Sequence, residues 1–358
     1  MMRRIKSVKP EDAVFMGLAW TSPFAPFYNA PMQFPSSPIQ PLLDIRGLKT
    51  WYPVKKGVFA RTVGYVRAVD GVDLTLARGE TLGIVGESGC GKSTLARSIL
   101  RLERPREGTI HVDGVNVLRA RGAALHAYRR TVQVVFQDPY ASLNPRHTVL
   151  DILTEAMLAH GLVTRENRRE AAVRLLADVG MSDDILDRYP HAFSGGQRQR
   201  LCIARALALE PQLLICDEAV SALDLSVRAQ VLNLLEDLQE KRGLAYLFIT
   251  HDIGVVQHIA DRIAVMYLGN IVETGPAPTV LGEPAHPYTQ LLLRAVPKIG
   301  VPLPEETGVP SEPTSRRPQS GCAFAPRCPL ADDTCRAAAP ILKPSPRDPN
   351  HLTACFKA

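Results

Sequence analysis

The sequence predicts an α/β fold with a mainly parallel sheet, and two observations support this prediction. Short apolar runs rich in β-branched residues recur along the chain, as in buried parallel strands; they are residues 81–85, 131–136, 213–217 and 246–250. A glycine-rich loop, residues 86–94, follows the first run and leads directly into a helix-forming segment. Such a strand–loop–helix order is typical of α/β sheets that bind ligands at the carboxyl ends of their strands.

Length and composition are those of a globular protein. The 358 residues suffice for one large domain with an appendage or for two domains, and the composition is 46% hydrophobic and 22% charged. The net charge of +6 allows contact with anionic partners without favouring one. No apolar stretch approaches the length of a membrane-spanning helix, and Pro10 interrupts the basic start before a signal peptide could form. We therefore expect a cytosolic protein.

The chain begins with a segment unlike the rest. Residues 1–41 are rich in proline and aromatic residues and show no helical or strand periodicity, so we expect a flexible arm. From Leu42 onward, residues 42–45 and 66–74 alternate as strands do. Residues 52–57 between them are expected to form a turn or loop.

The glycine-rich loop fits the phosphate-binding pattern G-x-x-x-x-G-K-[ST] at every fixed position. Its glycines let backbone N–H groups close around phosphate oxygens, and the helix that begins near Lys92 points its positive end at the same anion. Lys92 is expected to reach the β- and γ-phosphates, and Ser93 to bind Mg²⁺. The ring of Trp51 or Tyr52 could contact the base of the nucleotide; the alternative is burial in the sheet. The loop consists of Gly86, Glu87, Ser88, Gly89, Cys90, Gly91, Lys92, Ser93 and Thr94.

Gln137 follows the run 131–136, at the sheet edge where α/β proteins bind ligands, and its amide could coordinate Mg²⁺ or a water. Residues 145–190 are polar and have helical periodicity, with Gly180 as an expected C-cap. This segment indicates a helical insertion into the sheet domain.

A second phosphate-binding helix end follows the insertion. Ser194 can cap the next helix, and Gly195 and Gly196 expose its first backbone amides, ahead of Gln197. Because one site does not need two such helix ends, the sequence predicts a head-to-tail dimer in which each chain completes the other's site.

Polar residues also end the later strands. Asp217 is expected to hold Mg²⁺, and Glu218 to orient and polarise the attacking water. Asp224 ends a tight loop, residues 221–224, before an amphipathic helix. A lone histidine at the position of His251 is usually structural, but as the third polar group at this edge it is interpreted as a γ-phosphate contact.

Together these segments resemble the ABC-type ATPases. Residues 86–94, 137, 193–197, 213–218, 221–224 and 251 have the order and rough spacing of the Walker A, Q-loop, signature, Walker B, D-loop and H-loop elements. The resemblance covers about residues 42–280 and implies a RecA-like parallel sheet core, an antiparallel β subdomain and a helical insertion at about 138–205. It also implies that Tyr52 is the A-loop aromatic, that Glu218, His251 and Gln137 act in catalysis, that Ser93, Gln137 and Asp217 bind Mg²⁺, and that ATP contacts the Walker A loop, Ser194–Gln197 and Asp224.

Within that family, residues 134–146, 216–224 and 286–292 resemble the ATP-binding subunits of oligopeptide/dipeptide permeases, and in particular the second of their two ATPases. Phe193 replaces the commoner signature leucine, which removes no group needed for hydrolysis. The resemblance implies import of di- or oligopeptides or related solutes at the cytoplasmic face of the inner membrane. The implied partners are a second, similar ATPase in a heterodimer, two transmembrane permease subunits and an extracytoplasmic solute-binding protein; no nucleic acid is expected.

We therefore divide the chain into an arm (1–41), a nucleotide-binding domain (42–275) and a C-terminal extension (276–358). The extension carries Cys322, Cys328, Cys335 and Cys355 among prolines. Four thiolates suit a tetrahedral zinc or a 4Fe–4S cluster. Because the gaps are wider than in zinc ribbons, and because permease ATPases with this tail resemble cluster-binding proteins, we favour iron–sulfur. Unliganded surface thiols are the remaining alternative.

A rival function is a soluble ABC-type ATPase that acts on nucleic acid or the ribosome. Such proteins usually carry two cassettes or long coiled-coil insertions, whereas this chain has one cassette and no sustained heptad repeat. A regulator that binds ATP without hydrolysing it is opposed by the presence of Glu218 and His251.

Overall fold

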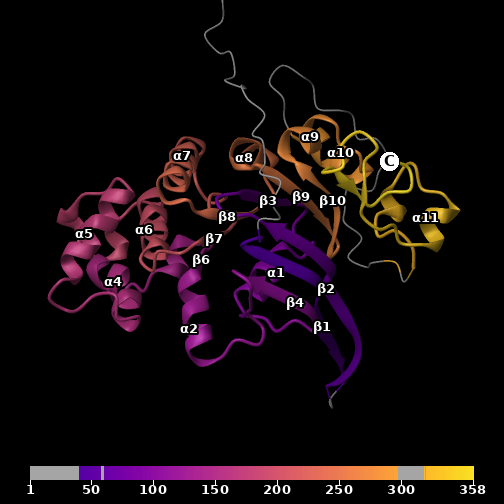
Figure 1. The fold of residues 1–358 in the computed structure, drawn as a ribbon. Coiled ribbons are helices and arrows are strands. Elements are labelled where there is room, and N and C mark those ends of the chain that lie inside the picture. The colour runs from indigo at the N-terminus through magenta and orange to yellow at the C-terminus, as the bar shows by residue number, and fades with distance from the viewer. Residues whose placement is uncertain (1–39, 58–59, 297–317, 319) are drawn as a thin grey trace, which may run out of the picture. The chain divides into compact units, whose positions relative to one another are not determined.

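The computed structural model describes residues 40–57, 60–296, 318 and 320–358 (Figure 1). The expected arm therefore lies outside the described residues, apart from Gln40 and Pro41. Residues 40–358 form a single unit of the chain.

The main sheet has eight strands in the order β11-β12-β10-β9-β3-β8-β7-β6. Five of them, β9-β3-β8-β7-β6, pair in parallel; the apolar runs predicted β3, β6, β7 and β8 but not β9. Every residue of β3, β7 and β8 is buried, because helices cover both faces of a parallel sheet. The bounds are β3 Thr81–Val85, β6 Val132–Val135, β7 Leu213–Asp217, β8 Ala245–Thr250, β9 Arg262–Tyr267, β10 Asn270–Pro276, β11 Lys343–Pro344 and β12 Leu352–Thr353.

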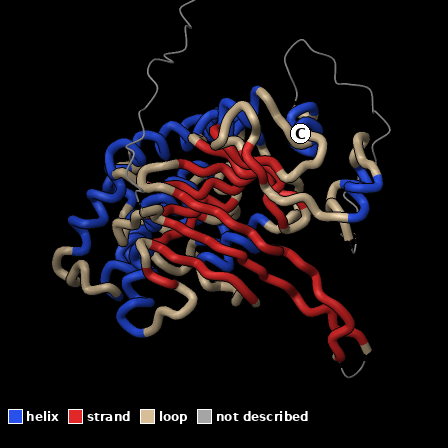
Figure 2. The backbone as a smooth tube through the Cα atoms, turned by 45° about the vertical axis from the view of Figure 1, so that its right-hand side comes forward, coloured by secondary structure: helices blue, strands red, loops and turns tan. Residues whose placement is uncertain are grey.

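A second, antiparallel sheet has the order β2-β1-β4-β5. The turn expected at residues 52–57 is wrong, because β1 continues to Lys56 and pairs with β2 along its whole length, with Pro53 opposite Tyr65. The two strands form the long hairpin that projects from the sheet in Figure 2. The bounds are β1 Leu43–Lys56, β2 Arg61–Leu76, β4 Glu107–Val112 and β5 Val115–Asn116.

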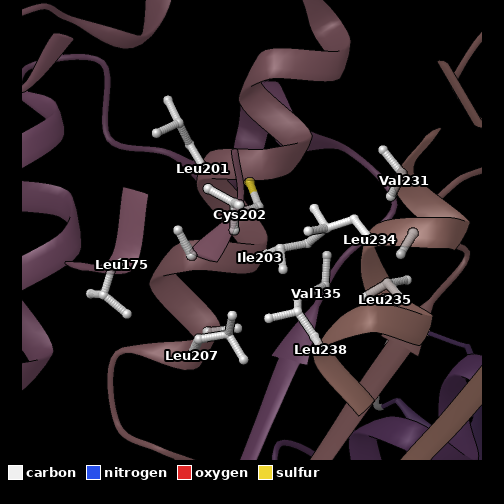
Figure 3. Packing of buried hydrophobic residues seen from close by; sticks show 14 of the residues in the cluster. Val135, Leu175, Leu201, Cys202, Ile203, Leu207, Val231, Leu234, Leu235 and Leu238 are labelled. Carbon is white, nitrogen blue, oxygen red and sulfur yellow. The ribbon is translucent and has the colours of Figure 1, made fainter. Parts of the chain in front are cut away.

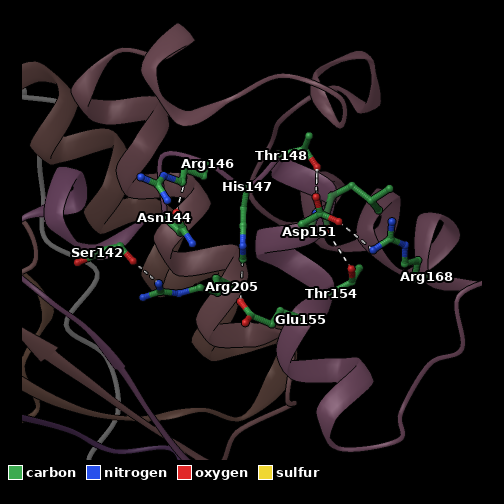
Figure 4. A network of polar contacts seen from close by, with 11 residues as sticks. Ser142, Asn144, Arg146, His147, Thr148, Asp151, Thr154, Glu155, Arg168 and Arg205 are labelled. Carbon is green, nitrogen blue, oxygen red and sulfur yellow. Dashed lines mark hydrogen bonds and ion pairs between the residues drawn. The ribbon is translucent and has the colours of Figure 1, made fainter.

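The helical insertion lies between β6 and β7, and polar contacts join its parts (Figure 4). Thr148 caps α4 by accepting a hydrogen bond from the amide of Asp151. The Asp151 carboxylate in turn accepts a hydrogen bond of 2.9 Å from Arg168 of α5. The insertion comprises α3 Pro139–Ser142, α4 Val149–Ala159, α5 Arg168–Asp178, the 3₁₀ turns Asp183–Ile185 and Pro190–Ala192, and α6 Gly195–Leu207.

Helices of the insertion share a core with the main sheet (Figure 3). Cys202 and Leu207 of α6 pack in one cluster with Leu235 and Leu238 of α7, Leu225–Arg242, and with Val135 of β6. Burial of each large apolar side chain contributes about 1.5–3 kcal/mol, so this cluster holds α6 firmly against the sheet. The other helices before the C-terminal region are α1 Lys92–Ile99, α2 Gly122–Thr131 and α8 Ile253–Ile259.

The C-terminal region adds strands to the main sheet. Strand β12 pairs with β10, placing Thr353 opposite Glu273, and His351 bonds the buried Glu273 carboxylate at 2.6 Å. The predicted domain boundary at 275/276 thus lies within the last residues of β10, the strand beside which the tail's β12 pairs. This region contains α9 Ala277–Gly282, α10 Pro287–Arg294, the 3₁₀ turn Ala325–Arg327 and α11 Asp333–Ala337. Among the described residues, none of the helices is both long and apolar enough to span a bilayer.

Candidate active site

The strand order brings most of the predicted motifs to one edge of the main sheet. Neighbouring strands β3, β8, β7 and β6 run parallel, so their carboxyl ends meet at the same edge. The phosphate-binding loop follows β3, His251 follows β8, Glu218 follows β7 and Gln137 lies two residues beyond β6. Residues as far apart in the sequence as Gly86 and His251, 165 positions, therefore lie at one site. From the sequence alone, this grouping could be inferred only by analogy with other α/β sheets.

The phosphate-binding loop is tightly curved between β3 and α1. Gly91, the N-cap of α1, has φ +113°, and a Cβ at this position would lie 1.9 Å from the carbonyl oxygen of Ala68. Only glycine fits this backbone. The ammonium of Lys92 is almost fully buried and donates hydrogen bonds to the carbonyl oxygens of Gly86 (2.7 Å) and Glu87 (3.0 Å). The loop thus curls around its own lysine.

Ser93 and Asp217 meet at the base of this loop. The Ser93 hydroxyl donates a hydrogen bond of 3.0 Å to the Asp217 carboxylate. Burial raises the pKa of Asp217, while the hydrogen bond from Ser93 opposes that rise. A hydroxyl and a carboxylate oxygen in contact are the hard ligands that Mg²⁺ prefers, so this pair fits the expected metal.

Glu218 and His251 form the second contact between neighbouring strand ends. The Nδ1 atom of His251 lies 3.2 Å from the Glu218 carboxylate. Glu218 has φ +51°, an uncommon conformation for a residue with a side chain, and its amide donates to the carbonyl oxygen of Ile249 at 2.8 Å. Strained residues of this kind cluster at functional sites, where the surrounding structure holds them in place.

Three other predicted parts make no hydrogen bond to this centre in the described part of the chain. Gln137 and Asp224 are exposed, and Asp224 begins α7 without capping it. Ser194 and Gln197 bond each other in a complete capping box at the start of α6, as the sequence predicted for Ser194. Ser194 and Gln197 are exposed, which leaves this helix end open to a second chain.

The two neighbouring aromatic residues of β1, Trp51 and Tyr52, have different surroundings. The guanidinium groups of Arg67 and Arg106 lie over the ring of Trp51 at 4.7 and 4.8 Å from its centroid. The indole N–H also donates to Asp70. The neighbouring Tyr52 is half-buried and has no ring contact in the described chain.

Two residues of the C-terminal region contact the phosphate-binding loop, and neither was predicted as a site residue. Arg327 makes an ion pair with Glu87, and the Tyr288 hydroxyl accepts a hydrogen bond from the Glu87 amide. Tyr288 lies in a segment that resembles peptide-permease subunits, but no spacing rule links position 288 or 327 to position 87. No local sequence pattern could predict the contacts of Tyr288 and Arg327 with Glu87, because they join distant parts of the chain.

The four C-terminal cysteines line one small pocket together with His286. All are free thiols, and burial raises the pKa of Cys322, Cys328 and Cys355. Nevertheless, no group of three or more His, Cys, Asp or Glu side chains in the described ranges is arranged so that it could hold a metal ion. The geometry therefore does not support the expected metal centre.

Comparison with protein families finds two matches. A family described as "ABC transporter" matches residues 69–221, and a family described as "Oligopeptide/dipeptide transporter, C-terminal region" matches residues 272–335. The second match covers Tyr288 and Arg327. Neither description mentions a metal.

Curated relatives are similar over most of the chain. The "Probable peptide ABC transporter ATP-binding protein y4tS" of Sinorhizobium fredii is 53% identical over 85% of this chain and 87% of its own length. The "Dipeptide transport ATP-binding protein DppF" of Escherichia coli is 49% identical (88% and 94%), and the "Oligopeptide transport ATP-binding protein AppF" of Bacillus subtilis is 48% identical (88% and 96%).

Among solved structures, the ATP-binding cassette MJ0796 is similar, with a TM-score of 0.58 and 29% identity over 66% of this chain and 98% of that chain. Its structure is described as a dimer in a post-hydrolysis state bound to ADP and Pi. The likeness confirms the predicted α/β architecture with its antiparallel β subdomain.

Proposed function

Because the chain belongs to the ABC transporter family, as an ATP-binding subunit of the oligopeptide/dipeptide type, we propose that it hydrolyses ATP to drive the import of di- or oligopeptides. The observation that carries the proposal is the site at the sheet edge, where Ser93 meets Asp217 and Glu218 meets His251. The relatives named for peptide transport are similar over both the cassette and the C-terminal region.

Each residue of the site has a chemical role in this proposal. The loop amides and Lys92 bind the phosphates, and Lys92 exchanges its bonds to Gly86 and Glu87 for phosphate oxygens. Ser93 and Asp217 would hold Mg²⁺, which would supply positive charge to neutralise the phosphates. Glu218 accepts a proton from the attacking water, and His251, whose Nδ1 lies beside the Glu218 carboxylate, contacts the γ-phosphate. The exposed Gln137 completes the site from β6, and Tyr52 stacks on the base.

The proposed working unit is a head-to-tail dimer. The exposed helix end Ser194–Gln197 and Asp224 would close over a nucleotide held by the partner ATPase subunit. The cassette MJ0796 among the similar structures is described as dimeric, which supports a dimer as the working unit. We expect the purified chain alone to hydrolyse ATP slowly, with a specific activity that rises with protein concentration and rises further with the partner ATPase. A high specific activity that does not change on dilution would contradict the shared site.

Coupling to the membrane subunits is proposed to run through the segment after Gln137. Two contacts hold this segment against α6. Arg205 of α6 donates a hydrogen bond to the Ser142 carbonyl oxygen (Figure 4). The guanidinium of Arg198, also of α6, lies 3.8 Å from the centroid of the Tyr140 ring. The ring of Tyr140 is exposed. Closure of the dimer over nucleotide would therefore move this exposed surface, at which the transmembrane permease subunits would dock.

The experiment that tests the function is uptake of a labelled dipeptide by cells that lack this chain. Uptake is expected to return with the wild-type chain and to stay absent with Lys92→Ala, because the variant loses its phosphate-binding ammonium. A Lys241→Ala variant, on the exposed face of α7, serves as the matched lysine control and is expected to restore uptake. Full uptake in the absence of the chain, or equal rescue by Lys92→Ala, would contradict the proposal.

The iron–sulfur cluster stands as a separate proposal, which the comparisons do not support. The convergence of Cys322, Cys328, Cys335 and Cys355 on one pocket is the observation in its favour. Iron, sulfide and zinc analysis of an anaerobic preparation decides between the cluster, zinc and unliganded thiols.

A further inference from the structure

Glu87 of the phosphate-binding loop is held from the C-terminal side at two points. Both oxygens of its carboxylate accept hydrogen bonds from Arg327, each of 2.9 Å, in a bidentate pair. Its backbone amide donates to the hydroxyl of Tyr288 at 2.9 Å. The carboxylate and the amide of one loop residue are thus both engaged by residues more than 200 positions away.

The residues that hold Glu87 are themselves immobilised. The Arg327 side chain is 2% exposed, whereas that of Glu87 is 24% exposed. The guanidinium lies 5.9 Å from the ring of Tyr267 and 5.8 Å from that of Phe324, both of which are buried. Tyr288 is fully buried and packs against the same two rings. The bidentate bonds to Glu87 raise the pKa of Arg327 further, so the arginine stays charged at every working pH.

This arrangement bears directly on phosphate binding. The carbonyl oxygen of Glu87 accepts from Lys92, so the position of Glu87 also sets the position of the lysine. The Glu87 amide donates to the Tyr288 hydroxyl, and the Glu87 carbonyl oxygen also accepts a hydrogen bond of 3.3 Å from the Cys90 amide, so three hydrogen bonds to its backbone fix Glu87 in the loop. A bidentate arginine–carboxylate pair fixes direction as well as distance, and lysine cannot reproduce it.

We propose that Arg327 is a positioning residue for the phosphate-binding loop, and that through Glu87 the C-terminal region sets the affinity of the site for MgATP. This inference rests on the proposed ATPase function. Arg327 does not touch the nucleotide; it holds Glu87, and Glu87 holds the curve of the loop. The part of the chain matched as the C-terminal region of peptide transporters therefore acts on the ATP site of the same chain.

The test measures MgATP binding and hydrolysis by the full chain, together with its melting temperature without nucleotide. Arg327→Met is expected to raise the Kd and KM for MgATP about tenfold while kcat changes less than about twofold, because the loop loses its alignment but no reacting group. Arg327→Lys keeps the charge without the fork and is expected to lie between wild type and Arg327→Met. Arg336→Met, an exposed arginine of the same region paired with Asp333, is the matched control and should bind MgATP as wild type does.

Glu87→Gln gives a second approach that does not leave a hole at the buried position 327. It is expected to raise the Kd as Arg327→Met does, and the double variant should be no weaker than either single one, because both remove the same interaction. Additive losses, a fall in kcat with unchanged KM, or wild-type binding by folded Arg327→Met would overturn the inference. Lys92→Ala distinguishes failure of this inference from failure of the proposed function. If Lys92→Ala abolishes MgATP binding while Arg327→Met does not weaken it, only this inference fails. If the wild-type chain itself does not bind MgATP, the proposed function fails.

Discussion

Replacing Glu218 by glutamine is expected to lower ATP turnover by about a hundredfold or more while MgATP binding stays unchanged. The amide of glutamine keeps the size of the side chain but cannot accept the proton of the attacking water, and general bases of this kind typically contribute 10²–10⁴-fold. The contact between His251 and the side chain at 218 can persist in the variant, so the site keeps its shape. Single-turnover hydrolysis and equilibrium binding of MgATP measure the two quantities separately.

The control for Glu218→Gln is Glu240→Gln. Glu240 is an exposed residue of α7 that makes no ion pair within the described chain, so this exchange is expected to leave turnover at the wild-type rate. Wild-type turnover by Glu218→Gln would contradict a role for Glu218 in the mechanism. A loss of MgATP affinity as large as the loss of turnover would mean that the carboxylate contributes to substrate binding and not to the reaction.

Replacing Gly91 by alanine is expected to destabilise the fold by about 3 kcal/mol or more and to abolish MgATP binding. The added Cβ would lie 1.9 Å from the Ala68 carbonyl oxygen and 2.8 Å from the end of Met266, and backbone atoms cannot rotate away as a side chain can. The positive φ of +113° adds strain of its own. Overpacking and backbone strain each cost about 1–3 kcal/mol, so their sum is large.

Gly161→Ala separates the two causes of that loss. Gly161 also has a positive φ, of +67°, but nothing lies within 4 Å of the position that its Cβ would take. Its replacement is expected to cost about 1 kcal/mol from backbone conformation alone and to leave MgATP binding intact. Denaturant unfolding measures the free energy of unfolding of both variants. An equal decrease in the two would mean that the contact between the new Cβ and Ala68 adds nothing to the destabilisation.

The sequence predicted the local parts of the site well because each depends on neighbours in the chain. The phosphate-binding loop requires glycines at fixed spacing between a strand and a helix, and Gly91 shows the backbone that this spacing demands. The capping box requires only Ser194 and Gln197, three residues apart. The Asp217 and Glu218 carboxylates end an apolar run and lie at the sheet edge, as expected for a buried parallel strand.

The errors came where pairing with a distant segment overrides local signals. The segment 52–57 contains a proline, two lysines and a glycine and resembles a turn, but β2 supplies a partner strand as far as Lys56. The tail was predicted as an extension beyond residue 275, whereas its strand β12 joins the main sheet by pairing with β10. The arginines that lie over the Trp51 ring, Arg67 and Arg106, likewise come from another strand and a loop, which no local pattern predicts.

The sequence by itself determined the class of the protein, the phosphate-binding loop and the order of the strand-end residues, since strand, loop and helix propensities act over a few neighbouring positions. Only the tertiary structure decided which of these residues touch, namely Ser93 with Asp217 and Glu218 with His251. It alone placed Arg327 on Glu87, across 240 positions of sequence. The physical reason is that a bidentate ion pair requires two side chains at one distance and angle, and the packing of Tyr267, Tyr288 and Phe324 sets that geometry.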